Sequence, residues 1–211
     1  MKFACIRQYV VPSILLLVLS MPSFALTIGG YDIPQVIPAT SDHAELKLNG
    51  ASMRILYGVV DTYIGKLYVE NPVTDANALI EAEEYKRMVF QVVMKRVSGR
   101  RIAKAMYDAL QMNLSREEAA ALEARLQMLV SMFDSSLKRG EESYLEWGPE
   151  SGTRIVLNGD IKGVIEGKDF FDAILKIWVG DNPVGATFKN QVLGLEEYQA
   201  PKSMRKKGRR R

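Results

Sequence analysis

The sequence predicts an α+β fold in which one large antiparallel sheet is covered by helices on a single face. Three observations support this fold class. The predicted elements run strands, helices, strands, helix, whereas a doubly wound parallel sheet would alternate strand and helix throughout. Asn158-Gly159 separates two short apolar runs and is a strong hairpin signal. Ser115 and Glu118 form a capping box at the start of a helix.

The first half of the chain is expected to form mostly strands. Alternating runs rich in β-branched and aromatic residues predict strands over residues 45–48, 53–57, 60–70 and 86–97. Asn49-Gly50 is a frequent turn pair, so we expect a turn between the first two strands. Residues 26–44 contain Pro34 and Pro38 and are expected to be an irregular lead-in. A short helix over residues 75–82, capped by Thr74 or Asp75, is expected before the last of these strands.

Helices dominate the middle of the chain, and strands return after it. Ser98 is expected to open a helix through Asn113, because apolar residues recur there every three or four positions. A second helix, from Ser115 to about Ser135, carries a leucine-rich stripe that we interpret as a core face. The remaining elements are expected at 142–147, 153–157 and 161–166 (strands), 168–179 (an apolar helix) and 187–193 (a short helix).

The two ends of the chain are basic and the body between them is acidic. The 28 Lys and Arg residues and 25 Asp and Glu residues give a formal net charge of +3. Residues 1–25 hold two of the basic residues, residues 202–211 hold seven, and neither segment holds an acid. The body 26–201 therefore has 19 basic and 25 acidic residues, a net charge of −6. Such a body disfavours a nucleic-acid-binding domain, so no specific nucleic-acid partner is expected.

Residues 1–25 have the three parts of an export signal. Lys2 and Arg7 precede the apolar run Val10–Leu19, and Ser23-Phe24-Ala25 supplies small residues for cleavage. The run has about half of the ~20 residues that a membrane span needs. We therefore expect cleavage near Ala25 and a periplasmic or secreted protein.

Three segments remain once the leader is removed: the lead-in 26–44, one domain over residues 45–200, and the tail 201–211. Seven like charges in the tail predict a disordered segment. This tail is a candidate for loose contact with an anionic membrane surface. A merely solubilising role fits the pattern equally well.

Few catalytic chemistries are open to the mature chain. Loss of the leader removes Cys5, the one cysteine, which excludes disulfides, thiol nucleophiles and thiolate metal sites. No G-x-S-x-G, G-x-G-x-x-G or P-loop motif is present, so neither a cofactor nor a metal is expected. The one histidine, His43, lies in the lead-in and is interpreted as a solvated loop residue.

Arg54 and Thr62 come close together if the chain turns at Gly58. In one straight strand they would lie about 26 Å apart. If Tyr57-Gly58-Val59 is a three-residue hairpin loop, residues whose numbers sum to 116 pair, and Arg54 stands directly opposite Thr62. A guanidinium beside a hydroxyl in an apolar cleft suits a carboxylate or an oxyanion. The alternative is a surface arginine on an edge strand.

Several stretches in this order resemble the chalcone isomerase fold. They are Leu48-Asn49-Gly50-Ala51-Ser52-Met53-Arg54, Ile64-Gly65-Lys66-Leu67-Tyr68-Val69-Glu70, Leu157-Asn158-Gly159, Gly167-Lys168-Asp169-Phe170 and Ile177-Trp178-Val179-Gly180-Asp181-Asn182-Pro183. The set spans roughly residues 45–194 and is similar to exported bacterial chalcone isomerase-like proteins. The resemblance implies an open-faced β-sandwich with a ligand cleft between a large antiparallel sheet and its helices.

The resemblance also implies a site. In plant members an arginine on an early strand stabilises a phenolate that attacks an enone within the same molecule. In fatty-acid-binding members the matching arginine pairs with a carboxylate. By motif position this residue is Arg54, and Thr62 matches the family's threonine. Tyr57 and Tyr63 are further candidate donors to a ligand.

Two functions of different classes follow from these residues. The expected one is binding of a small amphipathic carboxylate, such as a fatty acid, in the cleft, without catalysis. The alternative is a cofactor-independent isomerase, an intramolecular lyase that acts by oxyanion stabilisation. A protein-interaction module whose cleft is filled by its own side chains is a weaker third candidate.

Overall fold

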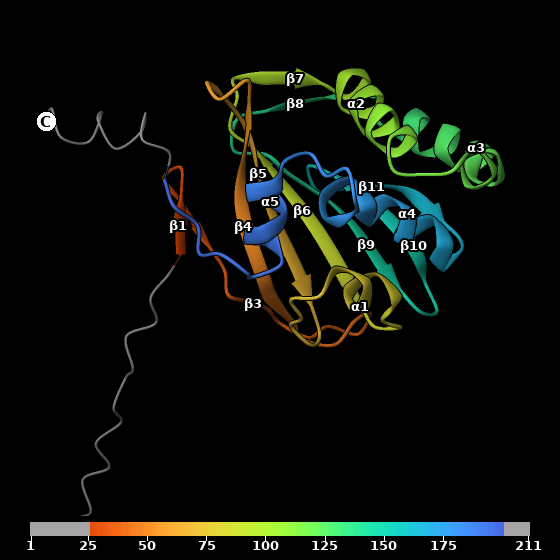
Figure 1. Ribbon diagram of the computed structural model, residues 1–211, viewed down its shortest axis with the longest axis horizontal. Coiled ribbons are helices and arrows are strands. Elements are labelled where there is room, and N and C mark those ends of the chain that lie inside the picture. Colours follow the sequence, from red (N-terminus) through yellow and green to blue (C-terminus); the bar gives the residue numbers. More distant parts are fainter. Residues whose placement is uncertain (1–25, 201–211) are drawn as a thin grey trace, which may run out of the picture.

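A seven-stranded antiparallel sheet with helices on one face forms the body of the protein (Figure 1). The computed structural model describes residues 26–200, so the leader and the tail lie outside the described residues. The strand order is β11-β10-β9-β6-β5-β4-β3, and every neighbouring pair is antiparallel. The predicted fold class is confirmed.

The bounds of the described elements follow. The strands of the large sheet are β3 (Val36–Ile37), β4 (Leu46–Leu56), β5 (Val60–Val69), β6 (Lys86–Val92), β9 (Glu142–Gly148), β10 (Gly152–Leu157) and β11 (Asp160–Ile165). Two small sheets pair β1 (Leu26–Ile28) with β2 (Tyr31–Ile33), and β7 (Arg96–Ser98) with β8 (Ser136–Lys138). The helices are α1 (Ala76–Glu81), α2 (Gly99–Gln111), α3 (Arg116–Met132), α4 (Lys168–Val179) and α5 (Ala186–Val192).

The main core lies between the sheet and the helices. Helix α4 has the bounds that the sequence predicts, and it is apolar on most sides because it packs against α1, α2, α5 and β10. Each large apolar side chain buried there stabilises the fold by ~1.5–3 kcal/mol. The capping box at Ser115 and the Asn158-Gly159 hairpin are also confirmed. Within residues 26–200, no helix is long and apolar enough to cross a membrane.

Asn49-Gly50 does not form the turn that the sequence predicts. It lies inside one continuous strand, β4, where the pairing with β5 shifts by one residue at a β-bulge. The side chain of Asn49 donates to Val192 O (2.9 Å) and accepts from Val73 N (2.7 Å). A Cβ at Gly50 would lie 2.1 Å from Gln191 O. The Asn-Gly pair therefore fits a bulge against which the end of α5 packs closely.

The lead-in is more regular than predicted. β1 and β2 form a hairpin through Gly29 and Gly30, both at positive φ, and β3 extends the edge of the large sheet at β4. Ile28 and Ile33 pack on the sheet face opposite the helices, against β4 and β5. A Gly-Gly pair between two short apolar runs is a hairpin signal that the sequence analysis left unused.

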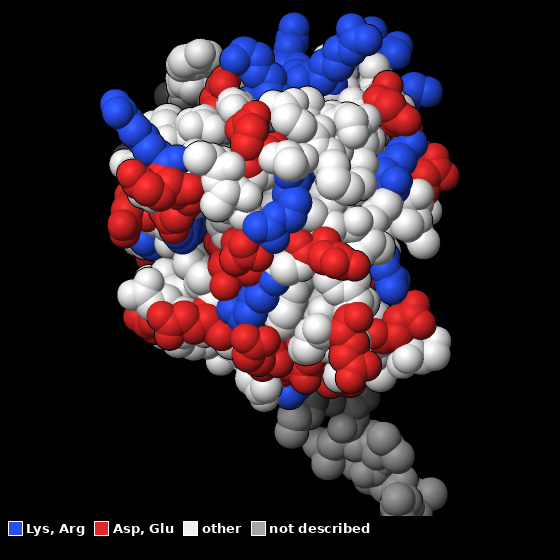
Figure 2. All heavy atoms as spheres, turned by 90° about the vertical axis from the view of Figure 1, so that its right-hand side faces the viewer, with Lys and Arg blue, Asp and Glu red and all other residues white. Residues whose placement is uncertain are grey.

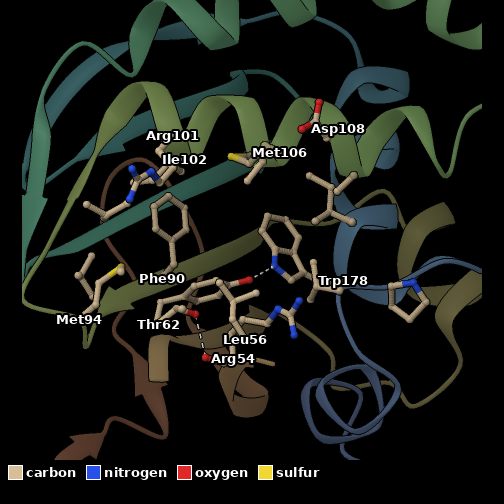
Figure 3. A pocket seen from close by; sticks show the side chains of 18 of the residues that line it. Arg54, Leu56, Thr62, Phe90, Met94, Arg101, Ile102, Met106, Asp108 and Trp178 are labelled. Atoms are coloured by element: carbon tan, nitrogen blue, oxygen red, sulfur yellow. Dashed lines mark hydrogen bonds between the residues drawn. The ribbon is translucent and has the colours of Figure 1, made fainter. Parts of the chain in front are cut away.

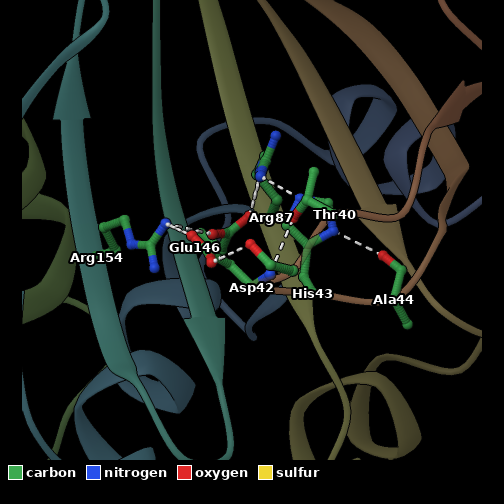
Figure 4. Close-up of polar contacts among 8 residues, drawn as sticks. Thr40, Asp42, His43, Ala44, Arg87, Glu146 and Arg154 are labelled. Carbon is green, nitrogen blue, oxygen red and sulfur yellow. Dashed lines mark hydrogen bonds and ion pairs between the residues drawn. The ribbon is translucent and has the colours of Figure 1, made fainter.

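His43 is buried, contrary to the prediction of a solvated loop residue, with 8% of its surface exposed. Its Nδ1 lies 2.6 Å from Ala44 O, and Nη2 of Arg87 donates to its Nε2 at 3.1 Å (Figure 4). Because arginine only donates, the ring hydrogen sits on Nδ1. Arg87 also pairs with Glu146, whose carboxylate lies 3.8 Å from Arg154. This network connects the lead-in to the face of the sheet that lies opposite the helices.

Candidate ligand-binding cleft

A cleft of about 720 Å³ opens between the sheet and helix α2 (Figure 3). Its floor comes from β4, β5 and β6, and its far wall from α2. The end of α4 and the loop after it close one side. Most lining side chains are apolar, and its charged residues are Arg54, Arg101 and Asp108.

All four residues singled out from the sequence line this cleft: Arg54, Tyr57, Thr62 and Tyr63. The β4–β5 hairpin places them there. Its loop is Tyr57-Gly58-Val59, as predicted, and Gly58 takes the left-handed conformation (φ 69°). Tyr57 takes it as well (φ 53°). Their contact with a ligand stays a prediction.

The predicted pairing of Arg54 with Thr62 is wrong by one residue. Leu56 pairs with Val60 and Ile55 with Asp61, but a bulge then pairs Arg54 with Tyr63. Thr62 is the extra residue, and its carbonyl accepts from the backbone N–H groups of Val93 (2.9 Å) and Met94 (3.2 Å). The same contacts end β6 at Val92, so the predicted strand 86–97 is split into β6 and β7. Counting residues outward from the hairpin loop cannot reveal this bulge, because the segment after β6 creates it.

The hydroxyl of Thr62 already has a partner. It donates to the backbone carbonyl of Arg54 at 2.8 Å, so it fixes the strand that carries the arginine. Toward a ligand this oxygen is left as an acceptor.

Arg54 is partly buried and lacks a carboxylate partner among the described residues. Its Nη1 donates to Ile55 O (3.0 Å), and this hydrogen bond uses one of the five N–H groups of the guanidinium. A guanidinium keeps its charge when partly desolvated and offers a planar fork to two oxygens. The arrangement is therefore suited to an anionic head group.

Tyr63 supplies a second polar group to the floor of the cleft. Its hydroxyl accepts a hydrogen bond from Nε1 of Trp178 (3.0 Å), which leaves its own hydrogen available as a donor. Burial raises the pKa of Tyr63 to about 12, although the Trp178 hydrogen bond and the charge of Arg54 act in the opposite direction. The phenol therefore stays protonated at physiological pH.

Helix α5 supports the floor from one side. The ring of Phe188 packs edge-on against Tyr63, with centroids 6.0 Å apart. A Cβ at Gly65 would lie 2.3 Å from the Phe188 ring. This close approach explains the glycine in the Ile64–Glu70 stretch, because a side chain there would push α5 away from the sheet.

Most residues that line the cleft were not predicted from the sequence. They include Phe90, Met94, Arg101, Ile102, Met106, Asp108 and Trp178. One signal was available, since Ile177, Trp178, Asn182 and Pro183 belong to the stretch that carried the family resemblance and all line the cleft. The residues of α2 had no separate signal, because their spacing also fits an ordinary core face. Within residues 26–200, no group of three or more His, Cys, Asp or Glu side chains is arranged to hold a metal ion.

The comparisons with known proteins agree with this architecture. A family model described as chalcone isomerase-like matches residues 25–194. Among solved structures, a crystal structure of a fatty-acid binding protein from Arabidopsis thaliana is similar, with a TM-score of 0.65 and 18% identity. The match covers 80% of this chain and 95% of that chain. At 18% identity, this structural similarity is evidence for a shared fold. The search of curated proteins gives no significant match.

Proposed function

The chain belongs to the chalcone isomerase-like family, and we propose that its cleft binds a small amphipathic carboxylate such as a fatty acid. The observation that carries the proposal is Arg54, a cation without a carboxylate partner among residues 26–200, set in a mostly apolar cleft. The similar Arabidopsis protein, a fatty-acid binding protein, supports the same ligand class.

The dimensions and chemistry of the cleft support this ligand. Its volume of about 720 Å³ falls in the range of roughly 300–1,000 Å³ that is usual for small-molecule sites. Arg54 and the hydroxyl of Tyr63 face the head group, while Phe90, Met94 and Met106 contact the hydrocarbon chain. Methionine suits such a wall, because its flexible side chain adapts to ligands of different shape.

The test is titration of a long-chain carboxylate into wild type, Arg54→Gln and Arg54→Lys at two salt concentrations. A charge-assisted bidentate pair contributes about 2–3 kcal/mol, so Arg54→Gln should weaken binding ~30–150-fold. Lysine should rescue only in part, because it brings charge without the planar fork. The methyl ester should bind wild type and variants alike.

Arg116→Gln is a matched control, because Arg116 is exposed on α3, outside the cleft. It should leave carboxylate affinity within about 1 kcal/mol of wild type. Equal binding by wild type, Arg54→Gln and Arg54→Lys would show that Arg54 is not the anchor.

An isomerase is the second candidate, and the Tyr63 hydroxyl favours it. A neutral phenol and a guanidinium on one cleft floor can both stabilise a developing oxyanion. A cyclisation assay on a chalcone, with Arg54→Gln and Tyr63→Phe as variants, tests this candidate. Turnover that both substitutions abolish would replace the binding proposal, whereas the absence of turnover by wild type would exclude this reaction. For the third candidate, an interaction module, native mass spectrometry should detect no co-purifying small ligand.

Export is part of the proposal. Lys2, Arg7 and the apolar run Val10–Leu19 support a leader that is removed after Ala25. The mass of the protein recovered from an export-competent host should correspond to residues 26–211. Recovery of the folded, exported protein with Met1 intact would contradict this.

A further inference from the structure

The tip of the β4–β5 hairpin is apolar and exposed to solvent. Tyr57 is 93% exposed and Val59 80%, and their neighbours Leu56 and Val60 are 37% and 41% exposed. Both Tyr57 and Gly58 have positive φ, so a tight turn holds these side chains at the end of the hairpin. Solvent-exposed apolar side chains gathered at one tip are typical of a surface that contacts another apolar phase.

Basic residues gather beside this tip. Residues 94–104, which cross from β6 through β7 into α2, hold five basic residues and no acid. Two more basic residues, Lys138 and Arg139, lie at the end of β8, which pairs with β7. The exposed members of this basic surface are Lys95, Arg96, Arg100, Arg101, Lys104, Lys138 and Arg139. Of the acids nearby, Asp108 pairs with Lys104, and Glu141 accepts from the backbone N–H of Lys138.

The hairpin and the basic surface lie at the same end of the molecule. The backbone N–H of Met94 donates to Thr62 O at the base of the hairpin, and Arg139 N donates to Lys95 O. The tip and β7 accordingly appear together at the top of Figure 1. In Figure 2, blue side chains gather along the upper edge of the molecule, and acidic side chains are more frequent below.

This end of the molecule is also one mouth of the cleft. Leu56 and Tyr57 from the hairpin, and Val97 and Arg101 from the basic side, all belong to the cleft lining. An apolar tip, a basic surround and an apolar cleft therefore meet at a single rim.

We propose that this end docks on an anionic lipid bilayer, with the hairpin tip entering the interface and the basic surface facing the lipid head groups. Tyrosine is enriched at the membrane interface, since its ring is apolar and its hydroxyl is polar. Basic side chains near an anionic leaflet are attracted to its surface charge. The acidic remainder of the body is repelled by the same leaflet, so this end faces the membrane.

Docking in this orientation opens the cleft toward the bilayer. A lipid-derived ligand can then pass between membrane and cleft along Leu56 and Tyr57 without full exposure to water. Bilayer docking depends on surface residues outside the proposed head-group site and is measured without any carboxylate ligand, so it can hold or fail independently of ligand binding.

The experiment measures vesicle binding by the mature chain, residues 26–211, using phosphatidylcholine vesicles with and without phosphatidylglycerol. One variant removes the apolar tip, Tyr57→Asn with Val59→Ser; asparagine tolerates the positive φ at position 57. Another removes charge, Arg96→Gln with Arg100→Gln. All variants keep residues 201–211, so any contribution of this basic segment to vesicle binding is the same in each.

Loss of either feature should weaken binding to the anionic vesicles. Two basic residues near an anionic leaflet account for a ~10–30-fold change in the partition coefficient. The tip variant should lose on the order of tenfold, and its loss should persist at high salt, because it is not electrostatic. Vesicles of phosphatidylcholine alone should bind all of these proteins weakly.

Matched controls alter the same residue types elsewhere. Met128→Ser with Ile161→Ser removes exposed apolar side chains on α3 and β11, and Lys47→Gln with Arg116→Gln removes exposed charges. Both controls should bind anionic vesicles as wild type does. Melting temperatures identify any variant that fails to fold, and Tyr57→Asn alone provides a second tip variant.

Two results would overturn the proposal. Wild-type binding by a folded tip variant would show that the hairpin does not enter the bilayer. Loss of binding in the charge variant alone would show general attraction to polyanions, such as nucleic acid or acidic proteins, in place of bilayer docking.

Discussion

Gly50→Ala tests whether the bulge in β4 is a packing requirement. A Cβ at this position would lie 2.1 Å from Gln191 O and 2.8 Å from Val192 O, both backbone atoms. Ordinary van der Waals contact needs ~3.5 Å, so the end of α5 would have to retreat by roughly 1.4 Å. That movement strains the hydrogen bonds Ser52–Gln191 (2.6 Å) and Asn49–Val192 (2.9 Å).

The expected cost follows from these contacts. Overpacking of this kind costs ~1–3 kcal/mol, and the two hydrogen bonds, one buried and one partly buried, contribute about 1 kcal/mol each. Alanine loses less backbone entropy on folding than glycine does, which offsets ~0.5–1 kcal/mol of this cost. The free energy of unfolding should therefore fall by about 3 kcal/mol, and the melting temperature by ~6–12 °C for a domain of this size.

Urea unfolding of wild type and three variants measures this cost. Gly185→Ala is the matched control, because its Cβ would lie 3.8 Å from the nearest atoms and its φ is extended. It should change stability by less than about 1 kcal/mol. Gly50→Asn should destabilise at least as much as Gly50→Ala, since the obstacle is space and Asn also carries a Cβ. If Gly50→Asn is tolerated, or if Gly50→Ala unfolds as wild type does, the close-packing explanation fails.

Three further predictions concern a buried lysine and the cap of helix α3. Lys86 is fully buried, and burial, with the charge of Lys168, lowers its pKa from 10.5 to about 8. Between pH 8 and pH 10.5 the unfolded state therefore binds more protons than the folded state, so the free energy of unfolding should rise by about 1 kcal/mol from pH 7 to pH 9. Lys86→Met should remove this rise in the urea unfolding midpoint. An equal rise with pH in wild type and variant would contradict the assignment to Lys86. Ser115→Ala should cost ~1 kcal/mol by removing the cap on Glu118 N. Hydrogen bonds from the Ser115 backbone and from Lys176 lower the pKa of Glu118 from 4.5 to about 2. The stabilising contribution of this carboxylate is therefore present above pH 4.5 and lost as the pH falls toward 2. An acid unfolding midpoint that Glu118→Gln leaves unchanged would refute this.

The location of the candidate site could be predicted from the sequence better than its detail. Arg54 lies in the cleft because the turn at Tyr57-Gly58-Val59 is a local feature with a clear glycine signal. The partner opposite Arg54 could not be predicted, since the bulge at Thr62 arises where a third segment, Val93 and Met94, bonds to its carbonyl. A pairing rule for two strands does not contain that third segment.

His43 shows the same limit for burial. Its surroundings in sequence are polar and irregular, which favours exposure. Its partner Arg87 lies 44 positions away on β6. Only the folding of the lead-in across the outer face of the sheet brings the two together.

The sequence by itself determined the order and type of most elements, the hairpin turns at Tyr57-Gly58-Val59 and Asn158-Gly159, and the capping box. These depend on residues within a few positions of one another, such as Ser115 and Glu118, so local conformational preference is enough. Only the tertiary structure decided which residues wall the cleft and why Gly50 must be small. Trp178 and Tyr63 are 115 positions apart, and Gln191 lies far along the chain from Gly50. Contacts at such separations depend on how sheet and helices pack, which no local pattern encodes.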